Sequence, residues 1–183
     1  MPDVSLVPLS AAAFAALAAG DLATANAVSP VPLTAYFAGP DWRPVWRRRA
    51  EQLVAHPEDA DWVTRVIWDR SRRVAVGRAG FHAAPDCHGM VEIGYAVVPA
   101  SRRRGCARAA FSQLLERARR EPAVRTVRVA ISPDNTASRQ LVLPYGFVLV
   151  GEQEDDEDGL ELVYEAPVTY GGDGNLDLPP EQP

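Results

Sequence analysis

The order of apolar and polar positions along this chain predicts strands and helices that follow one another in alternation. Residues 62–68 and 74–81 are rich in β-branched and aromatic residues, and the polar residues 69–73 between them predict a hairpin turn. Residues 44–55 have a helical pattern, with Pro44 at a first position that tolerates proline. The other expected elements are strands at 4–7, 91–98, 124–131, 148–153 and 160–165, helices at 11–19, 104–120 and 136–143, and a loop at 29–40.

This order of elements predicts an α/β (α+β) fold, in which a mixed, mostly antiparallel central sheet carries helices on both faces. A chain of 183 residues with 47% apolar content can bury a sizeable core, so we expect one domain over residues 1–166. Residues 167–183 contain four prolines and three glycines, which predicts a tail that is mobile or held by a neighbouring copy. The second alternative would make the protein a homodimer.

The composition argues against a membrane protein and against a secreted one. No stretch approaches the roughly 18 consecutive apolar residues that a membrane span needs. The alanine-rich residues 11–19 differ from a signal peptide, because Asp3 rather than a basic region precedes them and Gly20 ends them like a helix stop. Cys87 and Cys106 have neither the spacing of a metal clip nor the density of a disulfide scaffold. We therefore expect a cytoplasmic protein.

The charges are unevenly spread along the chain, which has a net charge of −5. All 19 basic residues are arginines within residues 1–150, where 13 acidic residues leave a net charge of +6. The other 11 acidic residues follow Gly151, and six of them form the run at 152–158. Nucleic acid is a poor partner, because the net charge is negative and no basic stripe with interleaved aromatic residues is present.

Residues 91–111 contain the most informative motif, a β-branched strand that runs through a turn with the spacing R-x-x-G-x-A into a helix. The first N–H groups of a helix have no intrahelical partner and lie at the positive end of its dipole, so they bind anions. Gly105 has no Cβ, which lets the oxygens of an anion approach the backbone. An ordinary strand-to-helix turn is the alternative. The residues expected at a diphosphate site are Arg102, Arg103, Arg104, Gly105, Cys106, Ala107 and Arg108.

A second motif follows at residues 127–147, where a strand leads into N-x-x-S, a short helix and a Gly-Phe pair. The two motifs together resemble the acetyl-CoA site of the GNAT superfamily of N-acetyltransferases, whose signatures are Q/R-x-x-G-x-G/A and N-x-x-S/A. Residues 102–107 match the first signature, and the second is matched by Asn135, Ser138, Leu141, Gly146 and Phe147. The resemblance covers roughly residues 62–165, with a looser likeness to the ribosomal-protein N-acetyltransferase branch near the N-terminus.

The resemblance implies acetyl-CoA as the cosubstrate, without a metal, and it assigns roles along the path of the cosubstrate. In this family the strand before the phosphate turn separates from the next strand. Backbone groups at Val97 and Val98 would then pair with pantetheine and polarise the thioester carbonyl. Asn135 would bind the pantetheine arm or cap the helix that follows it, and the two roles are compatible. The acidic residues 152–158 would form a funnel for a cationic amine or a solvated hairpin tip.

The residue that deprotonates the amine is expected on the strand at 91–98. Side chains alternate there, which puts Glu92 and Tyr95 on opposite faces, and burial in this apolar strand would raise the pKa of Glu92 toward that of a base. Arg102 lies ten residues later, close to the spacing of the basic glutamate in histone-type family members. The alternatives are a structural carboxylate paired with an arginine, and His82 as the base.

Two other groups of residues receive the simpler interpretation. The segment 82–88 holds two histidines, an aspartate and a cysteine, but Cys87 and His88 are adjacent and poorly spaced for one tetrahedral ion, so we predict no metal site. Cys106 is interpreted as a small residue beside the anion site rather than a nucleophile, because direct transfer to an amine needs no covalent intermediate.

One position departs from the family pattern. Many members carry a tyrosine seven residues after the asparagine of the second signature, where it protonates the CoA thiolate, and this chain has Val142 there. Tyr145 does not simply replace it, because Pro144 breaks the helix first. Water or Tyr95 would supply the proton, or the protein would bind acyl-CoA with little turnover.

We therefore expect an N-acetyltransferase that moves an acetyl group from acetyl-CoA to a primary amine by direct attack in a ternary complex. The acceptor would be a small molecule or a protein N-terminus. The alternative is a non-catalytic acyl-CoA-binding or sensing module of the same fold.

Overall fold

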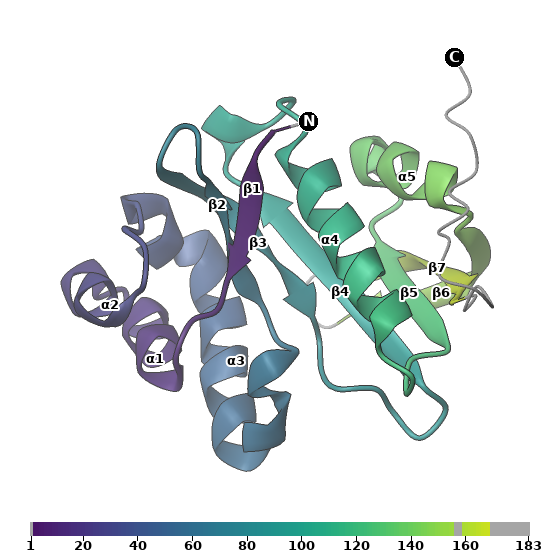
Figure 1. Cartoon of the computed structure of the whole chain (residues 1–183), viewed down its shortest axis with the longest axis horizontal. Helices are drawn as coiled ribbons and strands as arrows, with labels where there is room; N and C mark the ends of the chain where they lie inside the picture. Colours follow the sequence, from purple (N-terminus) through teal and green to yellow (C-terminus); the bar gives the residue numbers. More distant parts are fainter. Residues whose placement is uncertain (1, 156–158, 169–183) are drawn as a thin grey trace.

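The computed structural model describes residues 2–155 and 159–168, which form seven strands and five α-helices (Figure 1). The strands make one sheet in the order β1-β2-β3-β4-β5-β7-β6, and every neighbouring pair is antiparallel except β4 and β5. This confirms the expected mixed, mostly antiparallel sheet. The strands are β1 (Val4–Val7), β2 (Arg65–Asp69), β3 (Val74–Phe81), β4 (Met90–Val97), β5 (Thr126–Ile131), β6 (Val148–Asp155) and β7 (Gly159–Pro167).

Helices cover both faces of the sheet, as predicted. Three helices pack on one face over β1 to β3, and two pack on the other (Figure 1). No helix in the described ranges has both the length and the apolar character that a membrane crossing requires. The helices are α1 (Ala11–Ala19), α2 (Leu22–Val28) and α3 (Arg43–Ala55) on the first face, and α4 (Cys106–Arg120) and α5 (Thr136–Val142) on the second. The short 3₁₀ helices are η1 (Ala35–Ala38), η2 (Pro40–Trp42), η3 (Pro57–Asp61), η4 (Pro99–Ser101) and η5 (Leu143–Tyr145).

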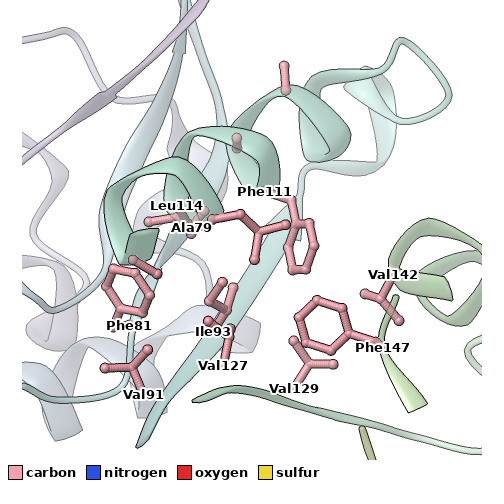
Figure 2. Close-up of a cluster of buried hydrophobic side chains, with 14 of the residues drawn as sticks. Ala79, Phe81, Val91, Ile93, Phe111, Leu114, Val127, Val129, Val142 and Phe147 are labelled. Atoms are coloured by element: carbon pink, nitrogen blue, oxygen red, sulfur yellow. The ribbon is translucent and has the colours of Figure 1, made fainter. Parts of the chain in front are cut away.

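Alternation of side chains along each strand divides the buried residues into two clusters. On β4, Val91 and Ile93 belong to the cluster under α4 and α5, whereas Val98, just past the strand, belongs to the cluster under α1 to α3. Figure 2 shows Phe111 and Leu114 of α4 in the first cluster, above the sheet residue Ile93. α4 and α5 thus cover one face of β4, and α1 to α3 cover the other face at its carboxyl end.

An additional helix and a later strand start distinguish the first half of the structure from the expectation. Residues 20–28 contain α2, whose seven residues are too few to show a helical period; Asp21 caps it by accepting a hydrogen bond from Thr24 N at 2.9 Å. β2 begins at Arg65 rather than at residue 62, because two N–H groups in the segment before it donate to Asp59 O at the end of η3. The aromatic and β-branched run before β2 is therefore a turn, not a strand.

The last hairpin is longer than expected. β7 ends at Pro167, and the next residue still donates its N–H to Arg125 O at 2.8 Å. β6 continues to Asp155, so the first part of the acidic run 152–158 belongs to a strand. Residues 156–158 and the tail from residue 169 lie outside the described residues. The domain boundary and the homodimer therefore stay predictions.

Candidate functional site

The two parallel strands β4 and β5 pair along only part of their length. Their register covers three positions and ends where Glu92 lies opposite Arg128. Beyond this pair β4 continues to Val97 and β5 to Ile131, and the structure shows no further pairing between these described residues. The carboxyl ends of the two strands thus separate, and their facing backbone edges border a gap.

Pairing with β3 decides which peptide groups of β4 face this gap. His82 N donates to Glu92 O at 2.8 Å, and Val98 N donates to Val76 O at 2.9 Å, so the peptide groups of residues 92 and 98 turn toward β3. Hydrogen-bonding groups alternate along a strand, so the residues between them at odd positions turn toward β5. The residues whose peptide groups border the gap are Ile93, Tyr95 and Val97.

The prediction that Val98 offers its N–H to a ligand is therefore wrong, because β3 already binds that N–H. Adjacent residues of a strand turn their peptide groups in opposite directions, so only Val97 of this pair borders the gap. Sequence reasoning missed Tyr95 and Ile93 as backbone positions, although counting alternate residues back from Val97 would have found them.

The turn after β4 leaves the start of α4 open to an anion. Arg103 and Gly105 both adopt left-handed backbone conformations, with φ of 59° and 78°. Gly105 is the N-cap of α4 and no side chain caps the helix, so its first N–H groups lie free at the positive end of the dipole. The arginines around this turn are exposed to solvent; they are Arg102, Arg103, Arg104 and Arg108.

The Cys106 side chain points away from this turn and into the core. It is 2% exposed and packs in the cluster under α4, and burial raises the pKa of its thiol. A thiol held protonated by burial is a poor nucleophile, which agrees with its interpretation as a small residue. Cys106 can therefore contribute its backbone N–H, but not its side chain, to an anion site at the turn.

α5 begins on the other side of the gap, where β5 ends. Asn135 caps it, because its Oδ1 accepts a hydrogen bond from Ser138 N at 3.1 Å. The cap occupies only the oxygen of this side-chain amide, so its NH₂ group can still bind a ligand. Val142, at the position of the family's tyrosine, is fully buried, and the hydroxyl of Tyr145 already lies 2.7 Å from Ser112 Oγ.

The Tyr95 side chain lies on the face of β4 that α4 and α5 cover. Its ring contacts that of Phe111 on α4, with the centroids 5.7 Å apart. Burial raises the pKa of the Tyr95 hydroxyl, and Ser138 of α5 opposes this shift. The buried hydroxyl makes no hydrogen bond of normal geometry with the described part of the chain. A ligand in the gap could satisfy it.

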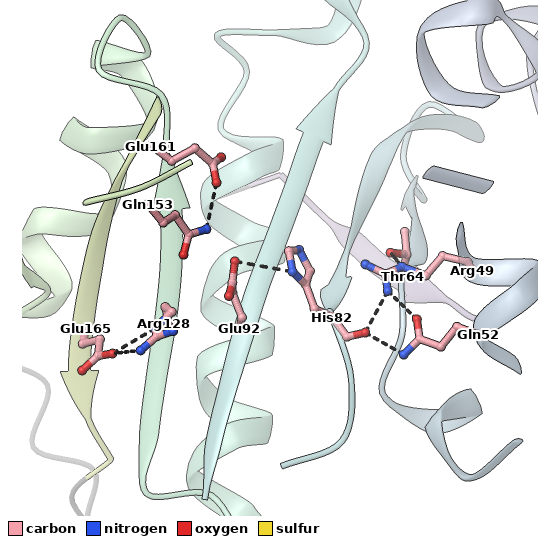
Figure 3. Close-up of polar contacts among 9 residues, drawn as sticks. All are labelled: Arg49, Gln52, Thr64, His82, Glu92, Arg128, Gln153, Glu161 and Glu165. Carbon is pink, nitrogen blue, oxygen red and sulfur yellow. Dashed lines mark hydrogen bonds and ion pairs between the residues drawn. The ribbon is translucent and has the colours of Figure 1, made fainter. Parts of the chain in front are cut away.

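Glu92 and His82 face each other on the opposite face of β4 (Figure 3). The Nδ1 atom of His82 lies 3.4 Å from Oε1 of Glu92, and 19% of the Glu92 side chain is exposed. Burial raises the pKa of Glu92; Arg128 opposes the rise, while Glu161 and Asp155 add to it. The predicted increase in the pKa of this carboxyl is thus present.

Arg128 does not neutralise Glu92, although the two residues are opposite each other in the β4–β5 register. Its Nε and Nη2 atoms bind the same oxygen of Glu165 on β7, at 2.9 and 2.6 Å (Figure 3). Within the described ranges, Glu92 has no arginine within ion-pair distance. The interpretation of Glu92 as a carboxylate paired with an arginine is therefore not supported.

His82 is a weaker candidate for the base than Glu92. Although 44% of its side chain is exposed, burial, followed by the charges of Arg49 and Arg48, lowers its pKa to about 4. An imidazole with this pKa is neutral at pH 7 and binds a proton weakly. Gly94 makes room for the ring, because a Cβ there would lie 2.6 Å from His82 Nε2. A glycine inside a β-branched strand was the available signal for this close approach.

The segment after His82 is organised as a turn. Asp86 Oδ1 accepts hydrogen bonds from His88 N at 2.8 Å and from Met90 N at 2.9 Å, and Cys87 is exposed between them. Among the residues described, no three histidine, cysteine, aspartate or glutamate side chains gather in a way that could hold a metal ion.

Comparison with known proteins identifies the family of this chain. The family model described as an acetyltransferase (GNAT) domain matches residues 4–148. The chain belongs to the GNAT acetyltransferase family. No curated protein sequence matches this GNAT chain.

Solved GNAT structures share the fold over nearly the whole chain. The ribosomal-protein-S5-alanine acetyltransferase from Vibrio fischeri has 16% identity and a TM-score of 0.58, over 90% of this chain and 92% of its own. A chimera of the Vibrio cholerae spermidine N-acetyltransferase SpeG and hSSAT has 14% identity and a TM-score of 0.62, over 90% and 95%. The Sinorhizobium meliloti phosphinothricin acetyltransferase, solved with AcCoA, has 18% identity and a TM-score of 0.59, over 90% and 88%.

Burial of Glu92 predicts a pH-dependent effect on stability. Because the pKa of Glu92 is raised in the folded state, ionisation costs stability as the pH rises through that pKa, and the cost is absent below the pKa of the unfolded chain. Glu92→Gln should therefore melt at a higher temperature than the wild type at pH 8. The two curves should converge toward pH 4.5. Thermal melts followed by circular dichroism measure this, and the exposed Glu51→Gln serves as the control; a lower melting temperature at pH 8 would contradict it.

Proposed function

We propose that this GNAT domain transfers an acetyl group from acetyl-CoA to a primary amine by direct attack in a ternary complex. The observation that carries the proposal is the arrangement around β4. A carboxylate with a raised pKa lies on one face, and the gap beside an uncapped helix start opens on the other. The cytoplasm, where acetyl-CoA is available, is the proposed location.

The residues around the gap fit coenzyme A. The open N–H groups at Gly105 and the start of α4 would bind the diphosphate, with Arg102, Arg103, Arg104 and Arg108 adding positive charge. The NH₂ group of Asn135, the N–H of Val97 and the C=O of Ile93 would bind the pantetheine arm between β4 and β5. The C=O of Val97 already accepts a hydrogen bond from Arg102 Nε at 3.1 Å. The N–H of Tyr95 would then be placed to polarise the thioester carbonyl.

Glu92 would act as the base that takes the proton of the attacking amine, directly or through water. Its raised pKa brings it closer to the working pH, and its side chain lies on the face of β4 away from α4 and α5. The negative charges of Asp155 and Glu161 raise the pKa of Glu92 further, and they would attract a cationic acceptor to this face. Spermidine and a ribosomal-protein alanine in the names of the solved relatives agree with an amine.

Tyr95 would protonate the CoA thiolate in place of the tyrosine that this chain lacks at Val142. Its hydroxyl is protonated at neutral pH, burial raises its pKa further, and it makes no hydrogen bond of normal geometry in the described structure, with Ser138 as its polar neighbour. Base and acid would then stand on opposite faces of β4. The amine would arrive on one face and the thiol would leave on the other.

The fully buried Val142 favours a second candidate function, an acyl-CoA-binding module without turnover. Thiol release from acetyl-CoA, measured with a panel of amines, separates the two. Release with at least one amine supports the enzyme, and binding of acetyl-CoA without release on any amine supports the sensor.

Removal of the base predicts a loss of rate without a loss of binding. Glu92→Gln should lower kcat for acetyl transfer by about 10²- to 10⁴-fold, the usual contribution of a general base. The Kd for acetyl-CoA, measured by calorimetry, should stay within about twofold of the wild type. Unchanged kcat would exclude Glu92 as the base. His82→Asn then tests the alternative in which His82 is the base.

Removal of the acid predicts a loss that a second tyrosine does not reproduce. Tyr95→Phe should lower kcat by about 10²-fold at saturating substrates, because the thiolate loses its proton donor. Tyr145→Phe is the matched control, since its hydroxyl is engaged with Ser112 Oγ. Equal kcat values for the two variants would assign the proton to water.

Two glycines with the same backbone conformation test the phosphate turn. Gly105→Ala and Gly146→Ala place a side chain at φ of 78° and 82°, so the backbone conformation should cost each about 1 kcal/mol of unfolding free energy. At Gly105 the new Cβ would also lie 3.3 Å from Pro2 Cδ, and at Gly146 it would meet nothing within 4 Å. Only Gly105→Ala should also weaken coenzyme A binding, by about tenfold or more in calorimetry, because only that turn faces the diphosphate. Equal binding by both variants would place the diphosphate elsewhere.

A further inference from the structure

The peptide of His82 is held from both sides at the end of β3. Its N–H donates to Glu92 O at 2.8 Å. Its carbonyl oxygen accepts two hydrogen bonds from α3, from Arg49 Nη1 and from Gln52 Nε2, each at 2.8 Å (Figure 3). The residue is just past the last strand position, where a chain end would otherwise be free to move.

Gln52 is the centre of a partly buried polar network. Its Oε1 accepts from Arg49 Nη1 at 2.5 Å, and its Nε2 also donates to Asp59 Oδ2 at 2.6 Å. The other oxygen of Asp59 accepts from Ala84 N at 2.8 Å, so the network holds the segment on both sides of residue 83. Arg49 also donates a hydrogen bond from its Nε to Thr64 Oγ1 at 3.2 Å.

This network contains two buried charged side chains, where apolar residues would pack at a lower cost of desolvation. Arg49 is 5% exposed and Asp59 is 6% exposed, and they interact through an amide rather than as a direct ion pair. Burial lowers the pKa of Arg49 to about 10, which reflects the cost of placing its charge there. Several hydrogen bonds around a buried charge fix one geometry more strictly than apolar packing does.

The side chain on this held peptide is the imidazole that lies against Glu92. The ring has Gly94 on its Nε2 side, where even a Cβ would lie 2.6 Å away, and Glu92 at 3.4 Å from Nδ1. A neutral ring carries one proton, and a carboxylate beside Nδ1 favours the tautomer with the proton on that atom. The charged groups that act on the ring come from α3, β3 and β6; they are Arg48, Arg49, Arg78 and Asp155.

We propose that Arg49 and Gln52 are positioning residues, which act through the His82 peptide to hold a neutral imidazole with its Nδ1–H toward Glu92 and thereby fix the carboxylate for the incoming amine. This rests on the proposed role of Glu92 as the base. His82 is then a positioning residue as well, because it orients the base rather than taking the proton of the amine.

Gln52→Met tests the proposal, because methionine keeps the length of the side chain and removes all of its hydrogen bonds. The matched control is Gln113→Met, which removes a similar bond from a glutamine Nε2 to a backbone carbonyl, that of Val4 at 2.8 Å, on α4. At saturating substrates kcat should fall about tenfold or more for Gln52→Met and stay unchanged for Gln113→Met, with the KM for acetyl-CoA unaltered in both. The acidic limb of the pH profile of kcat/KM should shift only in Gln52→Met.

The histidine ring supplies a readout that does not depend on turnover. The chain has three histidines, so ¹⁵N NMR of the ring nitrogens resolves His82 once His82→Asn has assigned its signals. In the wild type the Nδ1–H tautomer should dominate at pH 7, and in Gln52→Met the two tautomers should mix. Arg49→Lys keeps the positive charge but loses the forked donor, so it should mix the tautomers while the ring stays neutral.

The outcomes separate this proposal from the proposed function. If Gln52→Met and Gln113→Met have the same kcat and the His82 signals do not change, the positioning role is overturned. If the wild type transfers acetyl to no amine, the proposed function fails. The His82 signals then decide alone whether Gln52 sets the tautomer. A variant that does not fold is replaced in the comparison by Arg49→Lys.

Discussion

The early end of pairing between β4 and β5 is the constraint on which the rest of this structure depends. Two parallel strands that separate leave backbone groups with no partner in the sheet, and such groups need a ligand or water. β4 is held away from β5 there, because β3 pairs with it from Ile93 to Val97 and Phe111 of α4 packs against Tyr95. The start of α4 and the cap of α5 therefore flank the place where the pairing of β4 with β5 ends.

The two faces of β4 carry different reactive groups, Glu92 on one face and Tyr95 on the other. Side chains three positions apart point to opposite faces of a strand, so Glu92 and Tyr95 are separated by the strand itself. Each is desolvated, and in each burial is the main cause of the raised pKa. The same strand thus offers a proton acceptor on one face and a proton donor on the other, which suits a reaction with a separate entry and exit.

The charges around His82 show that this region is arranged for more than stability. At neutral pH the buried charge of Arg49 and the raised carboxyl pKa of Glu92 each cost free energy in the folded state, whereas the lowered pKa of His82 costs stability only at acidic pH. The charge of Arg128 offsets part of the rise in the pKa of Glu92 from a distance, but its hydrogen bonds go to Glu165. Strain of this kind gathers at functional sites, where geometry is maintained at the expense of stability.

The sequence alone determined the features that depend on neighbours along the chain. The glycine turn before α4, the capped start of α5 and the two faces of β4 follow from local spacing, because caps and side-chain alternation act within a few residues. Only the tertiary structure decided that β3 takes the N–H of Val98, that Arg128 turns to β7, and that Arg49 reaches the carbonyl of His82. These contacts join residues far apart in the sequence, and they depend on strand register and helix placement, which no local pattern specifies.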